Sequence, residues 1–401
     1  MEASTETVAR AVKAPERPRL ALPTRDRRAA WFDRYRFAIL AYLATRVLLI
    51  AVAVVDGWIH TRSFTHEIGN WDGYWYHVLA ETGYPHHISH AQTVLGFFPL
   101  YSIVIRAVMP LVFGSAVTAG FIISMIGGLV ATVLVQRLAA GWWGEPAGRR
   151  AAILYCVFPG SVVFSMVYSE GLLLPLAAGC LLALEQRRWI IAGLCAGFAT
   201  ATEPDALVLI VVCAVAALLE LRRQGWSVRR AWRAFLAPLL SLTGAGAFAI
   251  FLWRWTGKPT ATLTAQHYGW KEKTDPFALV HLATRLAHQL HLSHFDVPTI
   301  NLNNPIGLIG AVILIGGIVL LLRRPAWIPL PALVWTLGIA FLACTSEYVP
   351  PNPRLLITAW PAIIVYARYI RGRKFAWLIA VMTLLLIELS ALTFVGITLR
   401  P

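Results

Sequence analysis

The chain has 401 residues, of which 58% are hydrophobic and only 14% charged, and its mean hydropathy is +0.64. A soluble globular domain of this composition would expose too much apolar surface, so that class is excluded. Several runs of about 18–25 apolar residues are each long enough to cross a bilayer. The sequence therefore predicts an all-α polytopic membrane protein.

The net charge is +15, and the basic residues lie mainly in short clusters between apolar runs. This pattern is typical of cytoplasmic loops beside anionic lipid, and it argues against a nucleic-acid-binding protein. The five cysteines lie inside apolar runs at unrelated spacings, so neither a disulfide framework nor a zinc site is expected.

Residues 1–35 are rich in Ala, Pro, Arg and Lys and lack the apolar core of a signal peptide. We expect a disordered basic cytoplasmic tail, followed by a transmembrane domain over residues 36–401. A first span at 37–55 leads into a polar outer loop at 56–115. Within this loop, residues 97–113 contain prolines and an arginine, which favours a re-entrant or interfacial helix over a span.

The later apolar runs predict ten further spans, at about 116–138, 150–167, 170–185, 189–203, 205–221, 234–253, 305–322, 328–345, 355–370 and 375–398. Basic clusters fall in the loops then expected to be cytoplasmic, namely Arg137 with Arg149–Arg150, Arg187–Arg188, Arg222–Arg233, Arg323–Arg324 and Arg368–Lys374. The result is about eleven transmembrane helices, a cytoplasmic N-terminus and a second large outer loop at 256–304.

One polar stretch, residues 70–84 with the sequence NWDGYWYHVLAETGY, follows the first span. It places Asp72 among indole and phenol rings at the depth of the membrane interface, where water is scarce. Such a carboxylate is suited to accept a proton from a hydroxyl held against it. The alternative is an interfacial aromatic belt that happens to contain an acid.

With this topology, the unusual polar residues face one compartment. They are Asp72, His77, Glu81, Glu170, Glu203, Asp205, Gln266, His267, Asp275, Glu347 and Arg354. Ionisable groups at membrane depth are costly and are usually functional, so we expect the chemistry on the outer face.

Several of these residues also have a purely structural explanation. Glu170, Glu203 and Asp205 lie where helices begin, and acids suit helix N-termini. Arg354 could hold a lipid phosphate through its fork of donors, or could simply extend to the headgroups. His288, His291 and His294 are spaced by three but have no matching carboxylate, so no metal site is predicted.

The order of motifs WDGYWYHVLAETGY, GFFPLY, FPGSVVFSMVYSEGLLL and NPRLLITAWPAIIVYAR resembles bacterial members of the PIG-V mannosyltransferase family. The resemblance covers about residues 37–370. It implies the fold of the GT-C class of membrane glycosyltransferases, with the active site on the extracytoplasmic face of the bacterial plasma membrane.

The resemblance also implies a reaction. A sugar, with mannose expected, passes with inversion from a polyprenyl-phosphate donor to a hydroxyl of a lipid, glycan or protein acceptor. No cofactor is expected. On this analogy Asp72 is the general base, and Arg354, Gln266 and His267 lie near the carrier phosphate. Further substrate contacts are expected at Trp71, Tyr74, His77, Glu81, Tyr101, Tyr168, Glu170, Glu203 and Trp270.

One position departs from the family. Relatives usually read A-T-R-P where this chain has Ala201-Thr202-Glu203-Pro204, so an acid replaces a cation. The sugar or acceptor could therefore differ, and a non-catalytic homologue stays open as an alternative.

A transporter or lipid flippase is the other competing class. It should place its polar residues near the midplane and show repeated halves, and the sequence has neither feature. The sequence also lacks an Asp-x-Asp motif and a Gly-rich phosphate loop, as expected for a lipid-linked donor.

Overall fold

The computed structural model describes residues 25–292, 301–323 and 326–395. The chain divides into two units, Met1–Arg36 and Phe37–Pro401, and all elements except the start of the first helix lie in the second unit. The described part of the predicted N-terminal tail is helical from Arg25 onward, while residues 1–24 lie outside the described residues. Apart from one isolated bridge between Thr274 and Ser346, the regular structure described is helical.

The α-helices, in chain order, are α1 (Arg25–Ile59), α2 (Phe64–Ile68), α3 (Asp72–Thr82), α4 (Pro99–Val108), α5 (Ala116–Trp143), α6 (Glu145–Val157), α7 (Glu170–Glu185), α8 (Trp189–Thr200), α9 (Val208–Arg223), α10 (Val228–Ala231), α11 (Leu236–Ser241), α12 (Thr243–Thr256), α13 (Ala261–Tyr268), α14 (Ala278–Leu292), α15 (Asn303–Leu322), α16 (Leu330–Thr345), α17 (Pro353–Thr358), α18 (Trp360–Ile364), α19 (Tyr366–Tyr369) and α20 (Gly372–Val395). Short 3₁₀ helices are η1 (Val94–Gly96), η2 (Met109–Val112), η3 (Pro159–Ser165), η4 (Pro204–Leu207) and η5 (Trp232–Phe235).

In the described part of the chain, six helical stretches are long and apolar enough to cross a bilayer. They are Ala30–Ile59, Ala116–Trp143, Pro204–Arg223, Val228–Thr256, Asn303–Leu322 and Gly372–Phe394. A seventh results if η3 and α7, bent by 111° at their junction, count as one broken span. The chain is thus a multi-pass helical membrane protein, as its composition predicts.

Two of the predicted spans are interrupted by proline. Residues 150–167 form the end of α6 and then η3, which begins at Pro159. Residues 355–370 form α17, α18 and α19 in place of one helix, and Pro361 lies in the first turn of α18, where its missing N–H costs no hydrogen bond. Residues 97–113 form α4 and η2, a short helical segment as expected, ending at Phe113 in a left-handed conformation.

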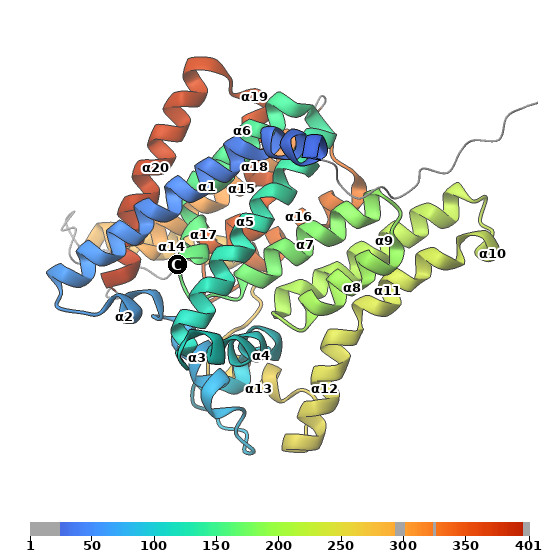
Figure 1. Cartoon of the computed structure of the whole chain (residues 1–401). Coiled ribbons are helices and arrows are strands. Elements are labelled where there is room, and N and C mark those ends of the chain that lie inside the picture. Colours follow the sequence, from blue (N-terminus) through green and yellow to red (C-terminus); the bar gives the residue numbers. More distant parts are fainter. Residues whose placement is uncertain (1–24, 293–300, 324–325, 396–401) are drawn as a thin grey trace, which may run out of the picture. The chain divides into compact units, whose positions relative to one another are not determined.

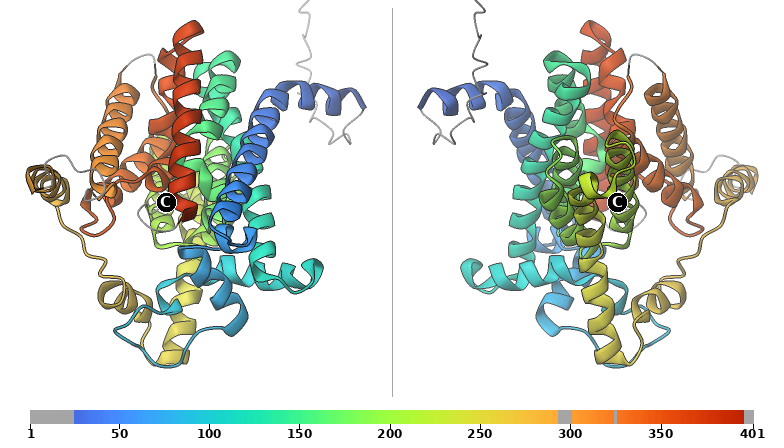
Figure 2. Two further views of the ribbon diagram at one scale, coloured as in Figure 1. Left: turned by 90° about the vertical axis from the view of Figure 1, so that its left-hand side faces the viewer. Right: turned by 90° about the vertical axis from the view of Figure 1, so that its right-hand side faces the viewer.

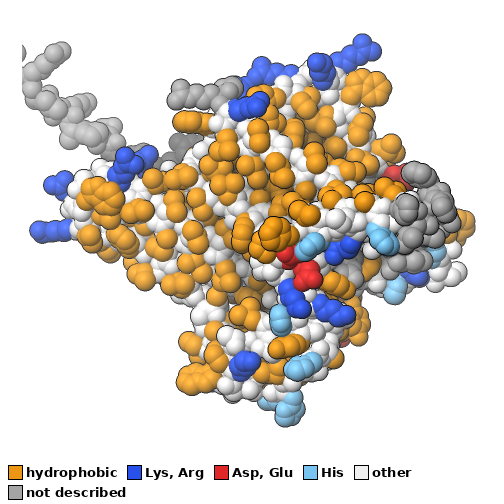
Figure 3. Space-filling model, turned by 180° about the vertical axis from the view of Figure 1, so that it is seen from behind, with side chains coloured by type: hydrophobic (Ala, Val, Ile, Leu, Met, Phe, Trp, Pro, Cys, Tyr) orange, Lys and Arg blue, Asp and Glu red, His pale blue; other side chains and the backbone are white. Residues whose placement is uncertain are grey.

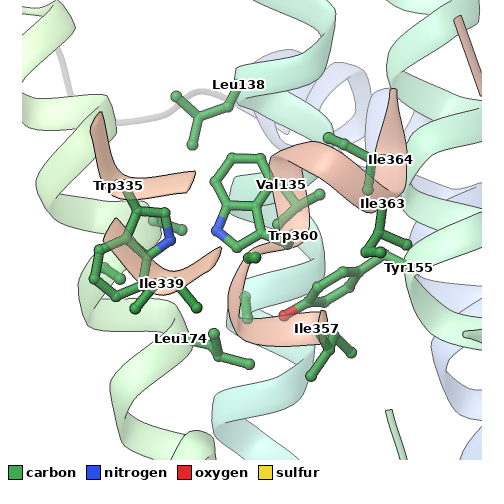
Figure 4. Packing of buried hydrophobic residues seen from close by; sticks show 14 of the residues in the cluster. Val135, Leu138, Tyr155, Leu174, Trp335, Ile339, Ile357, Trp360, Ile363 and Ile364 are labelled. Atoms are coloured by element: carbon green, nitrogen blue, oxygen red, sulfur yellow. The ribbon is translucent and has the colours of Figure 1, made fainter. Parts of the chain in front are cut away.

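The core of the second unit is built around two fully buried tryptophans (Figure 4). Trp335 of α16 donates its indole N–H to the carbonyl of Thr358 at 3.0 Å. Trp360 of α18 stacks on Trp142 of α5, with ring centroids 5.5 Å apart. These contacts fix the broken α17–α18 segment against α5 and α16.

The start of α7 lies unusually close to α5. A Cβ atom on Gly127 of α5 would lie 1.6 Å from the carbonyl oxygen of Gly171, so only glycine permits this approach. Small residues at such contacts let membrane helices pack closely. The close packing fixes the junction between η3 and α7 in space.

Helices α3, α4 and α13 lie together at one end of the second unit, with the end of α12 (Figures 1 and 2). Segment 272–275 after α13 pairs with the end of α16: Asp275 N–H donates to Thr345 O at 2.7 Å, and Glu347 N–H donates to Lys273 O at 3.0 Å. The segment after α13 is therefore joined to the segment that leads to Arg354.

Candidate active site

Asp72 is the first residue of α3, where an acid is favoured by the helix dipole. The preceding Trp71 has φ 57° and ψ −125°, a backbone conformation that is strained for a residue with a large side chain. Its indole N–H donates to the carbonyl of Thr393 near the end of α20 at 3.0 Å. The end of α20 thus holds the turn that presents Asp72.

Arg354 joins two carboxylates from distant parts of the chain. Its Nη1 donates to Oδ2 of Asp72 and its Nε donates to Oε1 of Glu170. The guanidinium carbon also lies 4.8 Å from the ring centroid of Tyr168. Arg354 itself is placed by the start of α17, where the Asn352 side chain accepts the Leu355 N–H at 2.9 Å.

Glu170 is the most deeply buried member of this group, with 1% of its surface exposed. Its Oε2 has no hydrogen-bond partner within the described residues. Asp72 and Arg354 are more accessible, with side chains 26% and 20% exposed. A ligand from outside therefore reaches Asp72 and Arg354 first, while Glu170 supports the guanidinium from behind.

A hydrogen-bonded chain runs behind the ion pairs. The hydroxyl of Ser169 bonds the carboxylate of Glu203 and, at 2.5 Å, the phenol of Tyr76. All three side chains are buried. Burial, together with the charges of Glu203 and Asp72, raises the pKa of Tyr76 well above its usual value, so the phenol stays protonated.

Two further predicted contact residues support the site without lining an open surface. Tyr101 is fully buried and donates its hydroxyl hydrogen to the carbonyl of Gly120 at 2.9 Å. Tyr168 is also fully buried, and its phenol oxygen accepts the N–H of Asp72 at 3.4 Å. Ser124 of α5 connects the two, since its hydroxyl bonds Tyr101 at 2.7 Å and the carbonyl of Tyr168 at 3.0 Å.

The predicted residues on α13 and just after it lie in or beside a neighbouring aromatic layer. Trp270 packs edge-on against Trp75 and Phe97, with ring centroids 5.1 and 5.2 Å away. Gln266 donates to the carbonyl of Gly96 at 3.0 Å, and the ring of His267 packs edge-on against Tyr268. No contact between Gln266 or His267 and the Arg354 group occurs within the described residues.

The exposed side of α3 carries the remaining predicted contacts. Tyr74 is 52% exposed and packs edge-on against His77. His77 Nδ1 lies 3.9 Å from Glu81 Oε1. Burial lowers the pKa of His77, and the nearby Glu81 carboxylate partly opposes this change. Figure 3 shows histidine, acidic and basic side chains together on one face near this end, with hydrophobic side chains over the surface above.

The sequence did not point to Ser169, Tyr76 or the apolar pocket behind α3. This pocket has a volume of about 590 Å³ and lies between α3, α4, α8 and α12. Its walls are mainly apolar, including Leu79, Tyr84, Ile103, Phe198, Phe248 and Phe251. The Leu100 N–H at its edge donates to Ala201 O at 2.9 Å, two residues before Glu203. The residues that line this pocket are apolar residues of four separate helices, which come together only in the folded protein. The sequence pattern therefore did not predict the pocket.

Within the described ranges, no group of three or more His, Cys, Asp or Glu side chains is arranged to hold a metal ion. His288 lies on α14, whereas His294 is outside the described residues. The ionisable centre of the site is therefore the group formed by Asp72, Glu170 and Arg354.

Comparison with solved structures finds likenesses to longer proteins, each with a TM-score under 0.5. ArnT from Cupriavidus metallidurans bound to undecaprenyl phosphate has 16% identity and a TM-score of 0.49, covering 83% of this chain and 61% of that chain. The apo oligosaccharyltransferase of Archaeoglobus fulgidus has 14% identity and a TM-score of 0.48, covering 91% and 56%. AglB from Archaeoglobus fulgidus with an inhibitory peptide and a dolichol-phosphate has 13% identity and a TM-score of 0.45, covering 90% and 56%. The chain thus spans about 60% of the length of these proteins.

No curated protein sequence matches the chain. The family described as Mannosyltransferase (PIG-V) matches residues 40–252, which is more than half of the chain and includes α3, α7 and the Glu203 turn. The match therefore covers Asp72, Glu170 and Glu203, and it ends before Arg354. The chain belongs to the PIG-V mannosyltransferase family.

Proposed function

We propose that this protein is an inverting glycosyltransferase of the GT-C class, which moves mannose from a polyprenyl-phosphate carrier to an acceptor hydroxyl on the outer face of the membrane. The observation that carries the proposal is the guanidinium of Arg354 joined to Asp72 and Glu170 in a member of the PIG-V family. A partly accessible carboxylate beside a partly accessible cation supplies the two functions that the reaction needs.

In this mechanism the acceptor hydroxyl attacks the anomeric carbon from the side opposite to the carrier phosphate. A new C–O bond forms, the bond to the phosphate oxygen breaks, and the electron pair leaves with the phosphate. Asp72 accepts the hydroxyl proton. One carboxylate is sufficient, because direct displacement needs no covalent sugar–enzyme intermediate.

The free oxygen of Asp72 supports this role. Its Oδ2 is held by Arg354, while its Oδ1 has no hydrogen-bond partner within the described residues. The ion pair fixes the orientation of the carboxylate and leaves one oxygen for the acceptor. Orientation of this kind is a large part of what a catalytic base contributes.

Arg354 is proposed to bind the leaving phosphate. It uses Nη1 and Nε for the two carboxylates, and in the described part of the structure its Nη2 forms no hydrogen bond or ion pair. Two or more hydrogens of the guanidinium are therefore available to phosphate oxygens, which match the geometry of this donor. A cation at this place stabilises the charge that develops as the bond breaks.

The pocket behind α3 is proposed to take the hydrocarbon chain of the lipid-linked substrate. Its apolar wall and volume of about 590 Å³ suit such a chain. Leu79 and Ala80 of α3 belong to this wall, so a hydrocarbon chain bound there lies against the helix that carries Asp72.

The finer topology is part of the proposal. Eleven crossings are obtained if α1, α5, α6 with η3, α7, α8, α9, α10–α12, α15, α16, α17–α19 and α20 each cross once. The basic loops then face the cytoplasm of a bacterial plasma membrane, and α3 faces the exterior. The remaining sequence-predicted substrate contacts, such as Tyr74 and Glu81, are proposed to lie on that outer side and to contact the acceptor.

The test uses the purified full chain in liposomes with a panel of radiolabelled polyprenyl-phosphate sugars and hydroxyl acceptors, among them glycolipids and short glycans. We expect covalent transfer or slow hydrolysis of the mannose donor, with release of polyprenyl phosphate. Movement of intact donor between leaflets without any bond cleavage would identify a flippase and contradict the proposal. Donor binding without cleavage for every sugar would identify a non-catalytic member.

A further inference from the structure

The Glu203 turn, where the resemblance to the family leads us to expect a cation, carries an acid that is buried and bonded to Ser169 and not to Arg354. Glu203 is 7% exposed and follows α8 in an extended conformation. Its carboxylate receives a hydrogen bond from Ser169, the residue directly before Glu170. An acid here is thus tied to the junction between η3 and α7.

The Ser169 hydroxyl connects that turn to α3 as well. It bonds the phenol of Tyr76 at 2.5 Å. A serine hydroxyl has one hydrogen, so when Ser169 donates to a carboxyl oxygen of Glu203 it accepts from Tyr76. The hydrogen-bonded chain Tyr76 to Ser169 to Glu203 then has one consistent direction and ends on that carboxyl oxygen.

Two members of this hydrogen-bonded chain, Tyr76 and Ser169, lie near carboxylates of the site in the sequence. Tyr76 is four residues after Asp72 on α3, so the two side chains lie on the same face of the helix. Ser169 precedes Glu170, whose Oε1 holds Nε of Arg354. A shift of Glu203 would therefore move Asp72 and Glu170 together, along with the guanidinium between them.

We propose that Glu203 is a positioning residue, which sets the geometry of the Asp72–Arg354–Glu170 group through Ser169 and Tyr76 without touching the substrate. The proposal rests on the glycosyl transfer proposed above. It assigns the acid at position 203 a role that the cation of the family would not fill, since a guanidinium cannot accept the hydrogen bond from Ser169.

The chemistry predicts a clear division among variants. Glu203→Gln keeps an oxygen that accepts from Ser169, whereas Glu203→Ala removes the acceptor. Because small displacements of a catalytic group can lower the rate by about 10²-fold, Glu203→Ala should lose about that much in kcat. The KM for the donor should stay within about threefold, since Arg354 and the pocket remain.

The test measures cleavage of radiolabelled polyprenyl-phosphate mannose by the full chain in liposomes, for the wild type, Glu203→Ala, Glu203→Gln, Ser169→Ala and the double variant of Glu203→Ala with Ser169→Ala. We expect Glu203→Gln to keep most of the wild-type kcat. We expect Ser169→Ala to match Glu203→Ala and the double variant to be no slower than either, because all three break one chain. Thr336→Val is the control, since Thr336 is equally buried but its hydroxyl bonds only its own helix, at Ala332.

Three results would overturn the inference. If Glu203→Ala keeps its kcat, the hydrogen bonds from Tyr76 through Ser169 to Glu203 do not position the site. If Glu203→Ala raises KM at unchanged kcat, Glu203 contacts the substrate. If Glu203→Gln is as slow as Glu203→Ala, the charge and not the hydrogen bond matters. A wild type that cleaves no donor would instead remove the proposed function, and this inference with it.

Discussion

Arg354 and Asp72 are 282 residues apart in the chain and form an ion pair at the start of α3. The pair joins two helix beginnings, since Arg354 lies in the first turn of α17 and Asp72 is the first residue of α3. It gives each residue a second function. Arg354 orients the proposed base, and Asp72 holds the proposed phosphate ligand in place.

The first prediction concerns the fork geometry of Arg354. Arg354→Lys keeps the charge, but an ammonium group lacks the planar fork of donors. It cannot bind both Asp72 and Glu170 and still offer a pair of N–H donors to the carrier phosphate. We expect weaker donor binding and lower kcat in Arg354→Lys, and a larger loss of both in Arg354→Ala. Binding of fluorescent polyprenyl phosphate to protein in nanodiscs measures the first effect. Equal donor affinity in all three proteins would show that Arg354 is only a boundary residue.

The second prediction concerns orientation in the membrane. Position 271 lies on the same side as Glu347, because Glu347 N–H bonds Lys273 O. Arg188 lies beyond the far end of α7, which starts at Glu170 and has 16 residues, or about 24 Å of rise. Single cysteines at positions 271 and 347 should react with an impermeant reagent on intact cells, while those at 188 and 323 should not. Protection of position 271 would place the site in the cytoplasm.

Much of the site could be predicted piece by piece. The sequence placed turns at 168–170, at 202–205 and before Arg354, and helices begin or break at all three places in the structure. It also predicted that these turns share a face with Asp72. Hydrophobic length and basic loops carry this information, because both are local features of a membrane chain. The family inferred from the order of motifs is confirmed by the match over residues 40–252.

The pairings could not be predicted. Whether Arg354 meets Asp72, Glu170 or a lipid depends on how closely α5, α7 and α17 pack, and that is decided by contacts such as Gly127 against Gly171. The hydrogen bond of the Tyr76 hydroxyl could not be predicted, because in the sequence Tyr76 is one of several consecutive aromatic residues. The prediction of one continuous helix over residues 355–370 was wrong. The apolar run is long enough for a span, but the helix breaks before α18, which has Pro361 in its first turn.

The third prediction uses a buried acid outside the site. Glu67 on α2 is fully buried, and neither of its carboxylate oxygens has a hydrogen-bond partner in the described structure. Burial and then the nearby Asp56 raise the pKa of Glu67 above its usual value, while Arg62 and His60 oppose this. The folded state therefore holds the Glu67 proton more tightly than the unfolded state does.

The sign of the effect follows from linkage. Stabilisation by the protonated acid is complete below the unfolded pKa of about 4.3 and is lost as pH rises through the higher folded value. Glu67→Gln mimics the protonated form, so it should raise Tm at pH 8 and lose this advantage near pH 4. The exposed Glu347→Gln is the control and should leave Tm unchanged. A Tm difference for Glu67→Gln that is independent of pH would contradict the argument.

The central claim is that Asp72 is the base, and turnover of Asp72→Asn tests it most directly. Asparagine keeps the size and can still accept a hydrogen bond from Arg354, but it cannot take a proton. We expect turnover of polyprenyl-phosphate mannose to fall by about 10²–10⁴-fold, the usual contribution of a positioned base, with donor binding nearly unchanged. Glu170→Gln, measured beside it, should lose less, because Glu170 is buried behind the guanidinium. An Asp72→Asn protein that turns over at the wild-type rate while Glu170→Gln is inactive would contradict the account and assign the base to Glu170.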